Sequence, residues 1–216
     1  MKLTVIDALS LSDAWYQCLK AALLEGREYV IQQGSFEGIR RREIELVAVN
    51  ISCPDIRPLS PDVPNGVPLP TTDDNIEEYM SYLMTPDKQE NEEYTYGEYL
   101  SPQIEEVIRR YRLGYDTNQM TMCVGSKDSI YQKDPPCLRL IDTRIQDGKL
   151  HFIVYFRSWD LWGGFPTNLG GLQILKEYMA SEIGVGDGEI HAFSKGLHLY
   201  EHAWDLAKMV LRMPLD

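Results

Sequence analysis

The stretch LHFIVYFRSWDLWGGFPTN, residues 150–168, lies at the centre of the structure that the sequence predicts. It opens as a nearly continuous apolar run rich in β-branched and aromatic residues, which indicates a buried strand. Arg157, Ser158 and Asp160 follow, then a Gly-Gly-Phe-Pro turn and Asn168. Polar groups at the end of a buried strand cost free energy unless partners or a ligand satisfy them. We therefore expect a polar binding site here; the alternative is a structural ion pair beside a capped helix start.

A β-hairpin is predicted immediately before this site. Two extended runs flank the Gln-Asp-Gly sequence at residues 146–148, and Asp-Gly is a strong hairpin signal. Cys137 heads the first run, directly after two prolines, and Arg157 ends the second. Because a hairpin brings these two ends together, we expect Cys137 and Arg157 to be neighbours. A nearby guanidinium stabilises a thiolate, which makes the thiol a better nucleophile near neutral pH.

Length and composition are those of one soluble globular domain. The chain has 216 residues, of which 44% are hydrophobic and 25% charged, enough for one domain with a sizeable core. We expect a single domain over residues 1–216. The formal net charge of -12 argues against an extended surface for nucleic acid or acidic membranes, because such surfaces need clustered Lys and Arg. Any anionic ligand should be small and lie in a local basic pocket.

The four cysteines indicate neither a zinc site nor a disulfide framework. Cys18, Cys53, Cys123 and Cys137 show no CxxC spacing and follow no secretory signal. We expect free thiols, no bound metal and a reducing, cytoplasmic location. No apolar run approaches the length that spans a membrane, so no membrane partner is expected.

The N-terminal part predicts a helix, an arginine cluster and a strand. Apolar residues at helical spacing in AWYQCLKAALLEG place Cys18 on the core side of a helix. A glycine-bearing loop then leads to Arg40, Arg41 and Arg42 and an alternating strand. At least one of these arginines should be solvated at the strand start, and the alternative for another is a place in an anion site.

Irregular and helical segments follow. A proline-rich segment, residues 53–70, predicts an irregular surface crossing. The helix after it, over residues 74–84, should bury an apolar stripe that includes Tyr79 and carry Glu77 and Glu78 in its first turn, where the helix dipole favours carboxylates.

The rest of the chain predicts an acidic loop over residues 85–100 and a helix over residues 101–115 that has proline near its start and glycine at its end. The strand NQMTMCVGS comes next, and it predicts Cys123 as a core thiol. After Asn168 we expect a long helix, a single strand EIHAFSKGLHLY and a last amphipathic helix.

Four motifs in order carry a resemblance to a known family. A Pro-Pro-Cys strand head, Arg-Ser-x-Asp, Gly-x-Pro-x-Asn and His-x-Tyr occur between Pro135 and about Trp204. Any one of them is a weak signal, but four in sequence at compatible spacings are specific. The set resembles the thymidylate synthase family and its nucleotide hydroxymethylase relatives. Upstream, ALLEG, VPLPTT and Tyr96-Gly97 fit the family's order more weakly.

The resemblance implies an α/β (α+β) fold with a mixed central sheet and packed helices. It also implies a symmetric homodimer formed through a sheet face, for which the alternative is a monomer with a covered sheet. The implied enzyme is a methyltransferase that converts dUMP to dTMP with a methylene-carrying reduced pterin. Its runner-up is a pyrimidine nucleotide hydroxymethylase, and a third hypothesis is a nucleotide-binding protein without turnover.

The motifs also imply residue roles. Cys137 would add to C6 of the pyrimidine, while Arg157 and Ser158 would hold the phosphate. Asp160 would lie beside the pterin, and Asn168 would contact the base. The chemistry of the residues agrees, since an Arg fork with a hydroxyl suits a phosphate monoester and a neutral amide can pair with N3–H and O4 of uracil. Cytosine would favour a carboxylate at that position, so dUMP is the expected substrate.

Further roles follow from the same resemblance. His198 and Tyr200 would bind the deoxyribose hydroxyl, although an ordinary strand histidine and a core-edge phenol are the alternatives. Glu78 would organise a catalytic water together with Tyr96, and Glu77 is the competing choice. Of the three consecutive arginines, Arg41 is the candidate phosphate ligand, and Arg40 and Arg42 are the alternatives. The other histidines considered, His151 and His202, are expected to be structural.

The chain also departs from the family's usual pattern. Asn118 and Gln119 occupy the positions of two arginines that reach the partner subunit's phosphate, and Leu138 follows the cysteine where histidine is common. The chain also stops soon after the last helix. These changes resemble the short archaeal branch of the family, which implies tetrahydromethanopterin as an alternative to 5,10-methylene tetrahydrofolate as carrier.

Overall fold

The computed structural model describes residues 1–33, 36–88 and 93–215. The elements are, in chain order, β1 (Leu3–Ala8), α1 (Leu11–Glu25), β2 (Arg27–Val30), β3 (Arg40–Ile44), β4 (Leu46–Ile51), α2 (Asp73–Met84), α3 (Tyr96–Tyr111), β5 (Thr121–Cys123), η1 (Lys127–Tyr131), β6 (Leu138–Gln146), β7 (Lys149–Phe156), β8 (Trp159–Asp160), α4 (Gly164–Ile183), β9 (Gly186–Ser194), β10 (Leu197–Tyr200), η2 (Glu201–Ala203) and α5 (Trp204–Val210). Parts of the predicted glycine-bearing and acidic loops, residues 34–35 and 89–92, lie outside the described residues.

The strands form two sheets. The larger has the order β1-β4-β9-β7-β6-β5, in which β1–β4 and β9–β7 are parallel pairs and the other pairs are antiparallel. This mixed central sheet with packed helices confirms the predicted fold class. The smaller sheet, β2-β3-β10-β8, was not predicted, because it unites short strands that lie far apart in the sequence.

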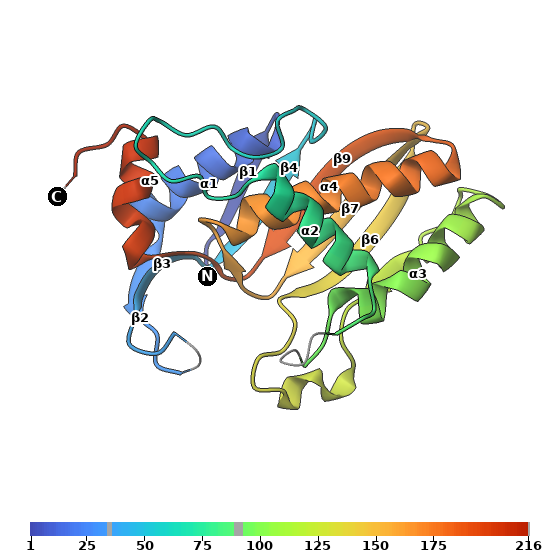
Figure 1. The fold of residues 1–216 in the computed structure, drawn as a ribbon, viewed down its shortest axis with the longest axis horizontal. Coiled ribbons are helices and arrows are strands. Elements are labelled where there is room, and N and C mark those ends of the chain that lie inside the picture. Colours follow the sequence, from blue (N-terminus) through green and yellow to red (C-terminus); the bar gives the residue numbers. More distant parts are fainter. Residues whose placement is uncertain (34–35, 89–92, 216) are drawn as a thin grey trace.

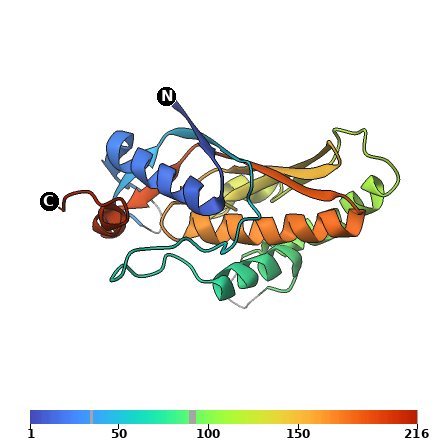
Figure 2. The ribbon, with the colours of Figure 1, turned by 90° about the horizontal axis from the view of Figure 1, so that it is seen from above.

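Helices cover one face of the larger sheet. Figure 2 shows α4 along one side of the sheet and α2 outside α4. Strand β7 lies inside the sheet, and its residues Leu150, Phe152, Val154 and Phe156 are at most 1% exposed. The intervening residues of β7 are half-buried on the face away from α4. The apolar run therefore fills the core beneath α4, as the quoted stretch predicted (Figure 1).

The predicted hairpin is confirmed. β6 pairs with β7 across a turn in which Asp147 has φ 51° and Gly148 has φ 72°. Two positive φ angles define the hairpin turn for which Asp-Gly is preferred, because glycine adopts them without steric cost. The first predicted helix is confirmed as well: Ser10 caps α1, and Cys18 is fully buried on it.

Several element boundaries differ from the prediction. Helix α3 begins at Tyr96, where Thr95 caps it, so Pro102 lies inside the helix and not near its start. Helix α2 begins at Asp73, which puts Glu77 and Glu78 in its second turn and not its first.

Three predictions from the C-terminal half and β5 are wrong in detail. Cys123 is exposed, because in β5 only the central residue, Met122, faces the core. The expected single strand after α4 is two strands, β9 and β10, which turn at Gly196 into different sheets. Asn168 lies within α4 and not ahead of it.

Two glycines let α2 approach α4 closely. A Cβ atom on Gly170 would come within 2.8 Å of the Ile76 side chain, and one on Gly171 within 2.7 Å of the Tyr79 ring and 3.0 Å of the Met80 backbone nitrogen. Real Cβ atoms do not approach other atoms so closely, so the helix packing requires small residues at both positions.

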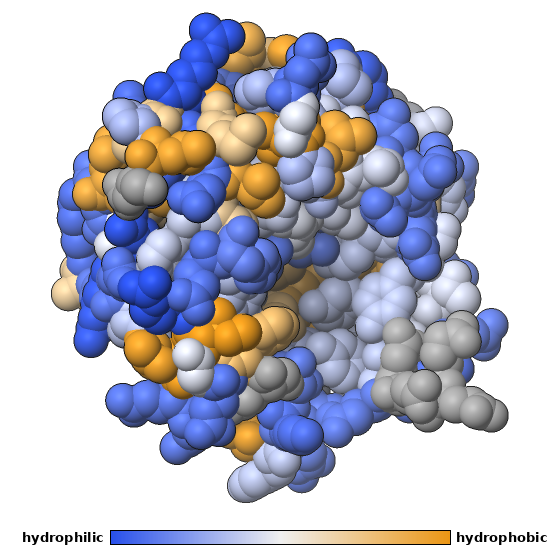
Figure 3. All heavy atoms as spheres, turned by 60° about the vertical axis from the view of Figure 1, so that its left-hand side comes forward, coloured by the Kyte–Doolittle hydropathy of each residue, from blue (hydrophilic) through white to orange (hydrophobic). Residues whose placement is uncertain are grey.

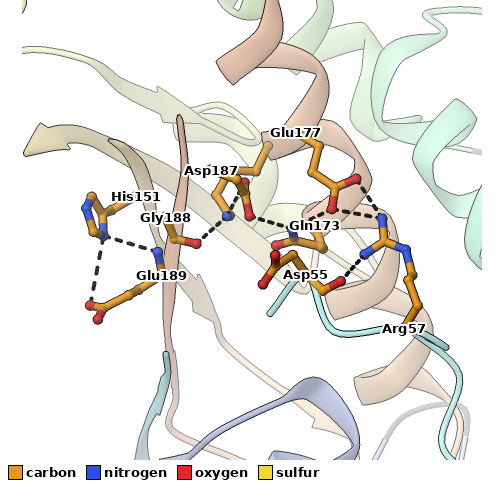
Figure 4. Close-up of polar contacts among 9 residues, drawn as sticks. Asp55, Arg57, His151, Gln173, Glu177, Asp187, Gly188 and Glu189 are labelled. Atoms are coloured by element: carbon orange, nitrogen blue, oxygen red, sulfur yellow. Dashed lines mark hydrogen bonds and ion pairs between the residues drawn. The ribbon is translucent and has the colours of Figure 1, made fainter. Parts of the chain in front are cut away.

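Polar contacts connect the proline-rich crossing to α4 and α4 to β9. Arg57 donates two hydrogen bonds to Glu177, and Gln173 donates to both Glu177 and Asp187 (Figure 4). The ammonium of Lys176, fully buried, bonds Asp187 in turn. The crossing continues to Pro70, which lines the cleft described below. No described helix is long and apolar enough to cross a membrane.

Candidate active site

Cys137 and Arg157 are neighbours, as predicted. The Arg157 backbone N–H donates to the Cys137 carbonyl oxygen at 2.8 Å. The Arg157 guanidinium holds the segment before the cysteine: Nε lies 3.1 Å from the Pro135 carbonyl oxygen, and Nη2 lies 3.0 Å from an Asp134 carboxylate oxygen. Cys137 itself is half-buried and packs against the core.

Arg157 lowers the pKa of the Cys137 thiol, as predicted, but the net shift of that pKa is upward. Burial raises the pKa of the Cys137 thiol above its ordinary value, and this effect exceeds the lowering by Arg157. Asp134 raises the same pKa further. Because Asp134 also pairs with Arg157, part of the guanidinium charge is already neutralised beside the thiol. In the free chain these effects together favour the protonated thiol.

Tyrosines from α2, α3 and the residues before α3 surround this thiol. The Tyr96 hydroxyl accepts a hydrogen bond from the Leu138 backbone N–H at 3.3 Å. Burial raises the pKa of Tyr96, and the nearby Cys137 raises it further. Tyr79 and Tyr82 pack against the Tyr96 ring at centroid distances of 6.1 and 5.3 Å. The Tyr79 hydroxyl is buried and has no hydrogen-bond partner among the described residues.

A cleft of about 450 Å³ opens beside the tyrosines. It is lined by Pro70, Asn75, Glu78, Tyr79, Tyr82, Gly163, Gly164, Thr167 and Asn168. It thus joins two predicted site residues, Glu78 and Asn168, while Glu77 is not part of its lining. Figure 3 shows the molecule from the side of β2 and β3, where the face is hollowed near its centre and side chains of intermediate hydropathy border the hollow.

The Asn168 side chain has a fixed orientation. Its Oδ1 accepts a hydrogen bond from the Trp159 indole N–H at 2.9 Å. Trp159 in turn stacks on Phe156, with centroids 3.9 Å apart and planes 8° from parallel. An amide oxygen has a second lone pair, so Asn168 keeps one acceptor position and both N–H donors for a ligand.

Asp160 holds the start of α4. Its Oδ2 accepts from the backbone N–H groups of Gly163 and Gly164 at 3.0 and 2.9 Å. A carboxylate is favoured there because the first N–H groups of a helix lack partners within the helix. Asp160 is thus a structural acceptor as well as a candidate ligand-binding residue. Ser158 is half-buried between Arg157 and β8.

His198 and Tyr200 lie on β10, beside β8. His198 pairs in register with Asp160, and its Nδ1 lies 2.9 Å from the Gly196 carbonyl oxygen. Its Nε2 is buried and has no hydrogen-bond partner among the described residues. Burial lowers the pKa of His198 to about 4, so the ring is neutral at pH 7. Because Nδ1 donates to Gly196, Nε2 carries the lone pair and can only accept.

The three arginines of β3 separate into two groups. Arg41 pairs in register with Tyr200, lies 2.7 Å from a Glu43 carboxylate oxygen and donates to the Tyr29 hydroxyl. Arg40 and Arg42 instead contact Glu28 and both lie over the Trp204 ring. Arg41 is therefore the arginine of β3 that adjoins His198 and Tyr200, and its charge is partly compensated.

Some residues of the site were not predicted to belong to it. The sequence predicts Tyr79 only as part of an apolar helix stripe and indicates no role for Trp159. Their hydrogen-bonding groups gave no local signal, because the sequence does not show that α2 lies over α4. Asn118 and Gln119 are exposed, and Gln119 lines a separate hollow beside α3.

The comparisons with known proteins agree on one family. A model of the family described as thymidylate synthase matches residues 85–215. The chain is 32% identical over 216 residues to a protein of Methanosarcina acetivorans provisionally named as a thymidylate synthase, with 96% of this chain and 94% of that protein covered. The chain belongs to the thymidylate synthase family. Cys137, Arg157, Asp160, Asn168 and His198 all lie inside the matched range.

Two other members of the thymidylate synthase family show its breadth. A Methanothermobacter thermautotrophicus protein, also provisionally named as a thymidylate synthase, is 28% identical over 224 residues, covering 96% of this chain and 98% of that protein. The deoxyuridylate hydroxymethyltransferase of Bacillus phage SP01 is 34% identical over 103 residues, which cover 45% of this chain and 27% of the phage enzyme. The two archaeal proteins are similar to this chain over nearly its full length, as the resemblance to the short branch predicted.

Proposed function

We propose that this chain is a thymidylate synthase, a methyltransferase that converts dUMP to dTMP with a methylene-carrying reduced pterin. The observation that carries the proposal is the position of Cys137 at the head of β6, between the Arg157 strand end and the Tyr96 hydroxyl. A nucleophile held beside a cation and a phenol can add to the C6 carbon of a pyrimidine.

Substrate contacts follow from the unsatisfied groups. The buried Nε2 of His198 is an acceptor without a partner among the described residues, which suits a deoxyribose hydroxyl donor, and the Tyr200 ring packs against the imidazole with centroids 4.8 Å apart. Asn168 offers an acceptor and two donors to the base, as uracil requires. Arg157 with Ser158, and Arg41, are the proposed phosphate ligands. A phosphate would also release Arg157 from its pairing with Asp134.

The chemical steps depend on the thiol. Cys137 Sγ, once deprotonated, adds to C6, and the displaced π electrons make C5 nucleophilic. C5 then attacks the methylene carbon that the reduced pterin carries, and a water held by Glu78 or Tyr96 removes the C5 proton. Loss of this proton expels the pterin nitrogen from the methylene carbon. Hydride from the released pterin then adds to the exocyclic methylene and leaves the pterin oxidised, and departure of the Cys137 sulfur from C6 releases dTMP. Asp160 and Tyr96 are the proposed contacts to the pterin, which is a folate or a methanopterin.

The phage enzyme supports a second candidate function. A deoxyuridylate hydroxymethyltransferase shares the matched segment, and it would differ only at the last step, where water in place of hydride reaches the C5 methylene. A nucleotide-binding protein without turnover is the third hypothesis. All three predict dUMP binding at the same residues, so binding alone does not separate them.

A tritium-release assay tests the proposal. Wild-type protein is incubated with C5-tritiated dUMP or dCMP, with folate and methanopterin carriers in parallel, and the product is analysed. Release from dUMP with dTMP as product supports the proposal. Release with 5-hydroxymethyl product would identify the hydroxymethylase. Nucleotide binding without any release would indicate the third hypothesis.

The open sheet face suggests the assembly. Leu3 and Val5 of β1 are each 54% exposed, and Phe193 of β9 is 36% exposed on the face away from α4. We propose that this face forms a symmetric homodimer of a cytoplasmic enzyme, since large exposed apolar side chains on one face are typical of an interface. Sedimentation that shows only monomer at micromolar concentration would contradict it.

A further inference from the structure

A row of polar side chains crosses the sheet face opposite α4. Asp7 of β1 pairs in register with Asn50 of β4, and Asn50 pairs with His191 of β9. Asn50 Nδ2 donates to Asp7 Oδ1 at 2.8 Å, and Asn50 Oδ1 lies 3.0 Å from His191 Nδ1. Because a carboxylate only accepts, Asn50 must present its NH₂ group to Asp7 and its oxygen to His191. His191 Nδ1 therefore carries a proton and donates it.

This tautomer brings two lone pairs face to face. The unprotonated Nε2 of a neutral His191 lies 3.2 Å from Glu189 Oε2. Neither atom can donate, so the contact is unfavourable unless a cation lies between them or the ring takes a second proton. Among the described residues, the polar side-chain contacts of His191 are to Asn50 and Glu189, so no protein donor lies between the two lone pairs.

A β-bulge brings His151 to the same place. The register between β7 and β9 shifts after Leu150, so that Gly188 and Glu189 of β9 oppose His151 of β7. A Cβ atom on Gly188 would lie 2.6 Å from the Leu150 carbonyl oxygen, which requires glycine there. The Glu189 backbone N–H donates to His151 Nδ1 at 3.2 Å, and that nitrogen lies 3.9 Å from Glu189 Oε2 (Figure 4). His151 Nδ1 is thus unprotonated, as a metal ligand must be.

We propose that His151, Glu189 and His191 bind a divalent transition-metal ion of the zinc type. One ligand atom from each residue lies within 4.8 Å of the other two. Two ligands of a tetrahedral zinc ion lie roughly 3.3 Å apart, which is close to the 3.2 Å between His191 Nε2 and Glu189 Oε2. His151 Nδ1 lies 3.9 Å from Glu189 Oε2, so the imidazole would move closer to the carboxylate and exchange its hydrogen bond from the Glu189 amide for the ion. Two imidazoles with one carboxylate suit zinc better than calcium or magnesium.

The surroundings also fit an ion. In the single chain a hollow of about 390 Å³, lined in part by Asp7, Asn50, Glu189 and His191, lies beside these ligands on the sheet face that the proposed dimer would cover. The Asn50–His191 hydrogen bond is the outer contact that commonly orients a ligating histidine. Three protein ligands leave a fourth position for water or for a group from a second copy of the chain. The ion would tie β7 to β9, and it would do so whatever reaction occurs at Cys137.

The test measures Zn²⁺ and Co²⁺ binding to the full chain after chelator treatment. Calorimetry with Zn²⁺ should give one equivalent per chain with a micromolar or tighter dissociation constant. His191→Gln and Glu189→Gln should weaken binding at least about 10-fold, and Asn50→Leu, which removes only the outer hydrogen bond, by roughly 10- to 100-fold. His202→Gln, which removes an exposed imidazole elsewhere, is the matched control and should bind as tightly as the wild type.

Co²⁺ absorption of the unmodified protein decides the ligand type even if a variant unfolds. Imidazole and carboxylate ligation gives weak visible bands without thiolate charge transfer, and that spectrum supports the site. A thiolate charge-transfer band would place the ion on a cysteine and overturn it. So would a wild type that binds no Zn²⁺ at micromolar concentration, or His191→Gln protein that binds it as tightly as the wild type.

Discussion

The backbone N–H of Arg157 donates to the carbonyl oxygen of Cys137 at 2.8 Å, so the strand that ends in the guanidinium lies directly beside the segment that carries the thiol. The same guanidinium bonds the Pro135 carbonyl and the Asp134 carboxylate. Arg157 thus positions Cys137. Because the guanidinium also pairs with Asp134, it stabilises a negative charge on the Cys137 sulfur only in part. An incoming phosphate that competes with Asp134 would change both functions together, which couples substrate binding to activation of the thiol.

The first prediction concerns the nucleophile. Cys137→Ser should reduce dTMP formation by several orders of magnitude, because without a covalent bond to C6 the C5 carbon is not sufficiently nucleophilic. Binding of dUMP should remain within a few-fold of wild type, since the proposed phosphate and base contacts come from Arg157 and Asn168. Single-turnover kinetics and nucleotide titration measure the two quantities separately.

The matched control is Cys123→Ser on β5, whose thiol is exposed and lies on another strand. It should leave turnover and binding unchanged. A 5-fluoro analogue of dUMP with a competent carrier should label Cys137 in both wild type and this control, and mass spectrometry that found the label on Cys123 or Cys53 would contradict the assignment.

The second prediction concerns base discrimination. Asn168→Asp keeps an oxygen for the Trp159 indole N–H and replaces the amide NH₂ by a second acceptor. The variant should lose preference for dUMP over dCMP, because an acidic side chain accepts from the cytosine amine and no longer donates to O4. Ratios of kcat/KM for the two nucleotides measure the change. Asn75→Asp, in the lining of the same cleft, should leave the ratio as it is in the wild type; unchanged ratios in both variants would remove Asn168 as the base contact.

Local signals in the sequence were sufficient for the hairpin and for the pairing of Cys137 with Arg157. Asp147-Gly148 specifies its turn through backbone conformation, and antiparallel pairing of the two strands then brings their far ends together. The buried face of β7 was equally visible, because its apolar residues form one continuous run. Such features depend only on residues close together in the sequence.

Features that depend on contacts between residues far apart in the sequence could not be predicted from it. Successive residues of β5 face opposite sides of the sheet, so a shift of the strand by one residue would decide whether Cys123 or its neighbour is buried. Asn168 belongs to α4 because the Asp160 carboxylate caps the chain before it. The raised pKa of Cys137 comes from burial, to which helices far away in the sequence contribute. Arg41 was distinguished from Arg40 and Arg42 only by its strand pairing with Tyr200.

The third prediction is a pH dependence of stability. Burial lowers the pKa of His198 to about 4, below its unfolded value near 6.5. The unfolded chain therefore binds a proton between these values that the folded chain does not, so stability is complete above pH 6.5 and falls as the pH drops towards 4. A shift of this size corresponds to about 3 kcal/mol at full protonation of the unfolded state.

Denaturant unfolding at a series of pH values from about 7.5 down to about 4, the pKa of His198, measures this loss of stability. His198→Gln should be less stable at neutral pH but should lose less stability on acidification than the wild type. His202→Gln, at an exposed position on the same segment, should keep the wild-type slope. Equal slopes in all three proteins would show that His198 is not held neutral by burial.

The last prediction concerns the packing that positions Glu78 and Tyr79. A Cβ atom on Gly171 would lie 2.7 Å from the Tyr79 ring, 3.0 Å from the Met80 backbone nitrogen and 3.2 Å from the Ile76 carbonyl oxygen. Two of these three atoms are backbone, so no change of rotamer relieves the clash and α2 must move away from α4. Overpacking costs about 1–3 kcal/mol, while alanine gains up to about 1 kcal/mol over glycine within a helix. Gly171→Ala should therefore lower the free energy of unfolding by roughly 1 kcal/mol.

Activity should respond more strongly than stability, because α2 carries Glu78 into the cleft. Displacing it should lower kcat at least about 10-fold while the KM for dUMP changes little, since a misplaced catalytic group raises the barrier without removing the phosphate and base contacts. Gly114→Ala, where a Cβ atom meets nothing within 4 Å, is the control and should alter neither quantity. Wild-type kcat in the Gly171→Ala protein, together with wild-type stability, would show that α2 does not need this close approach to place Glu78.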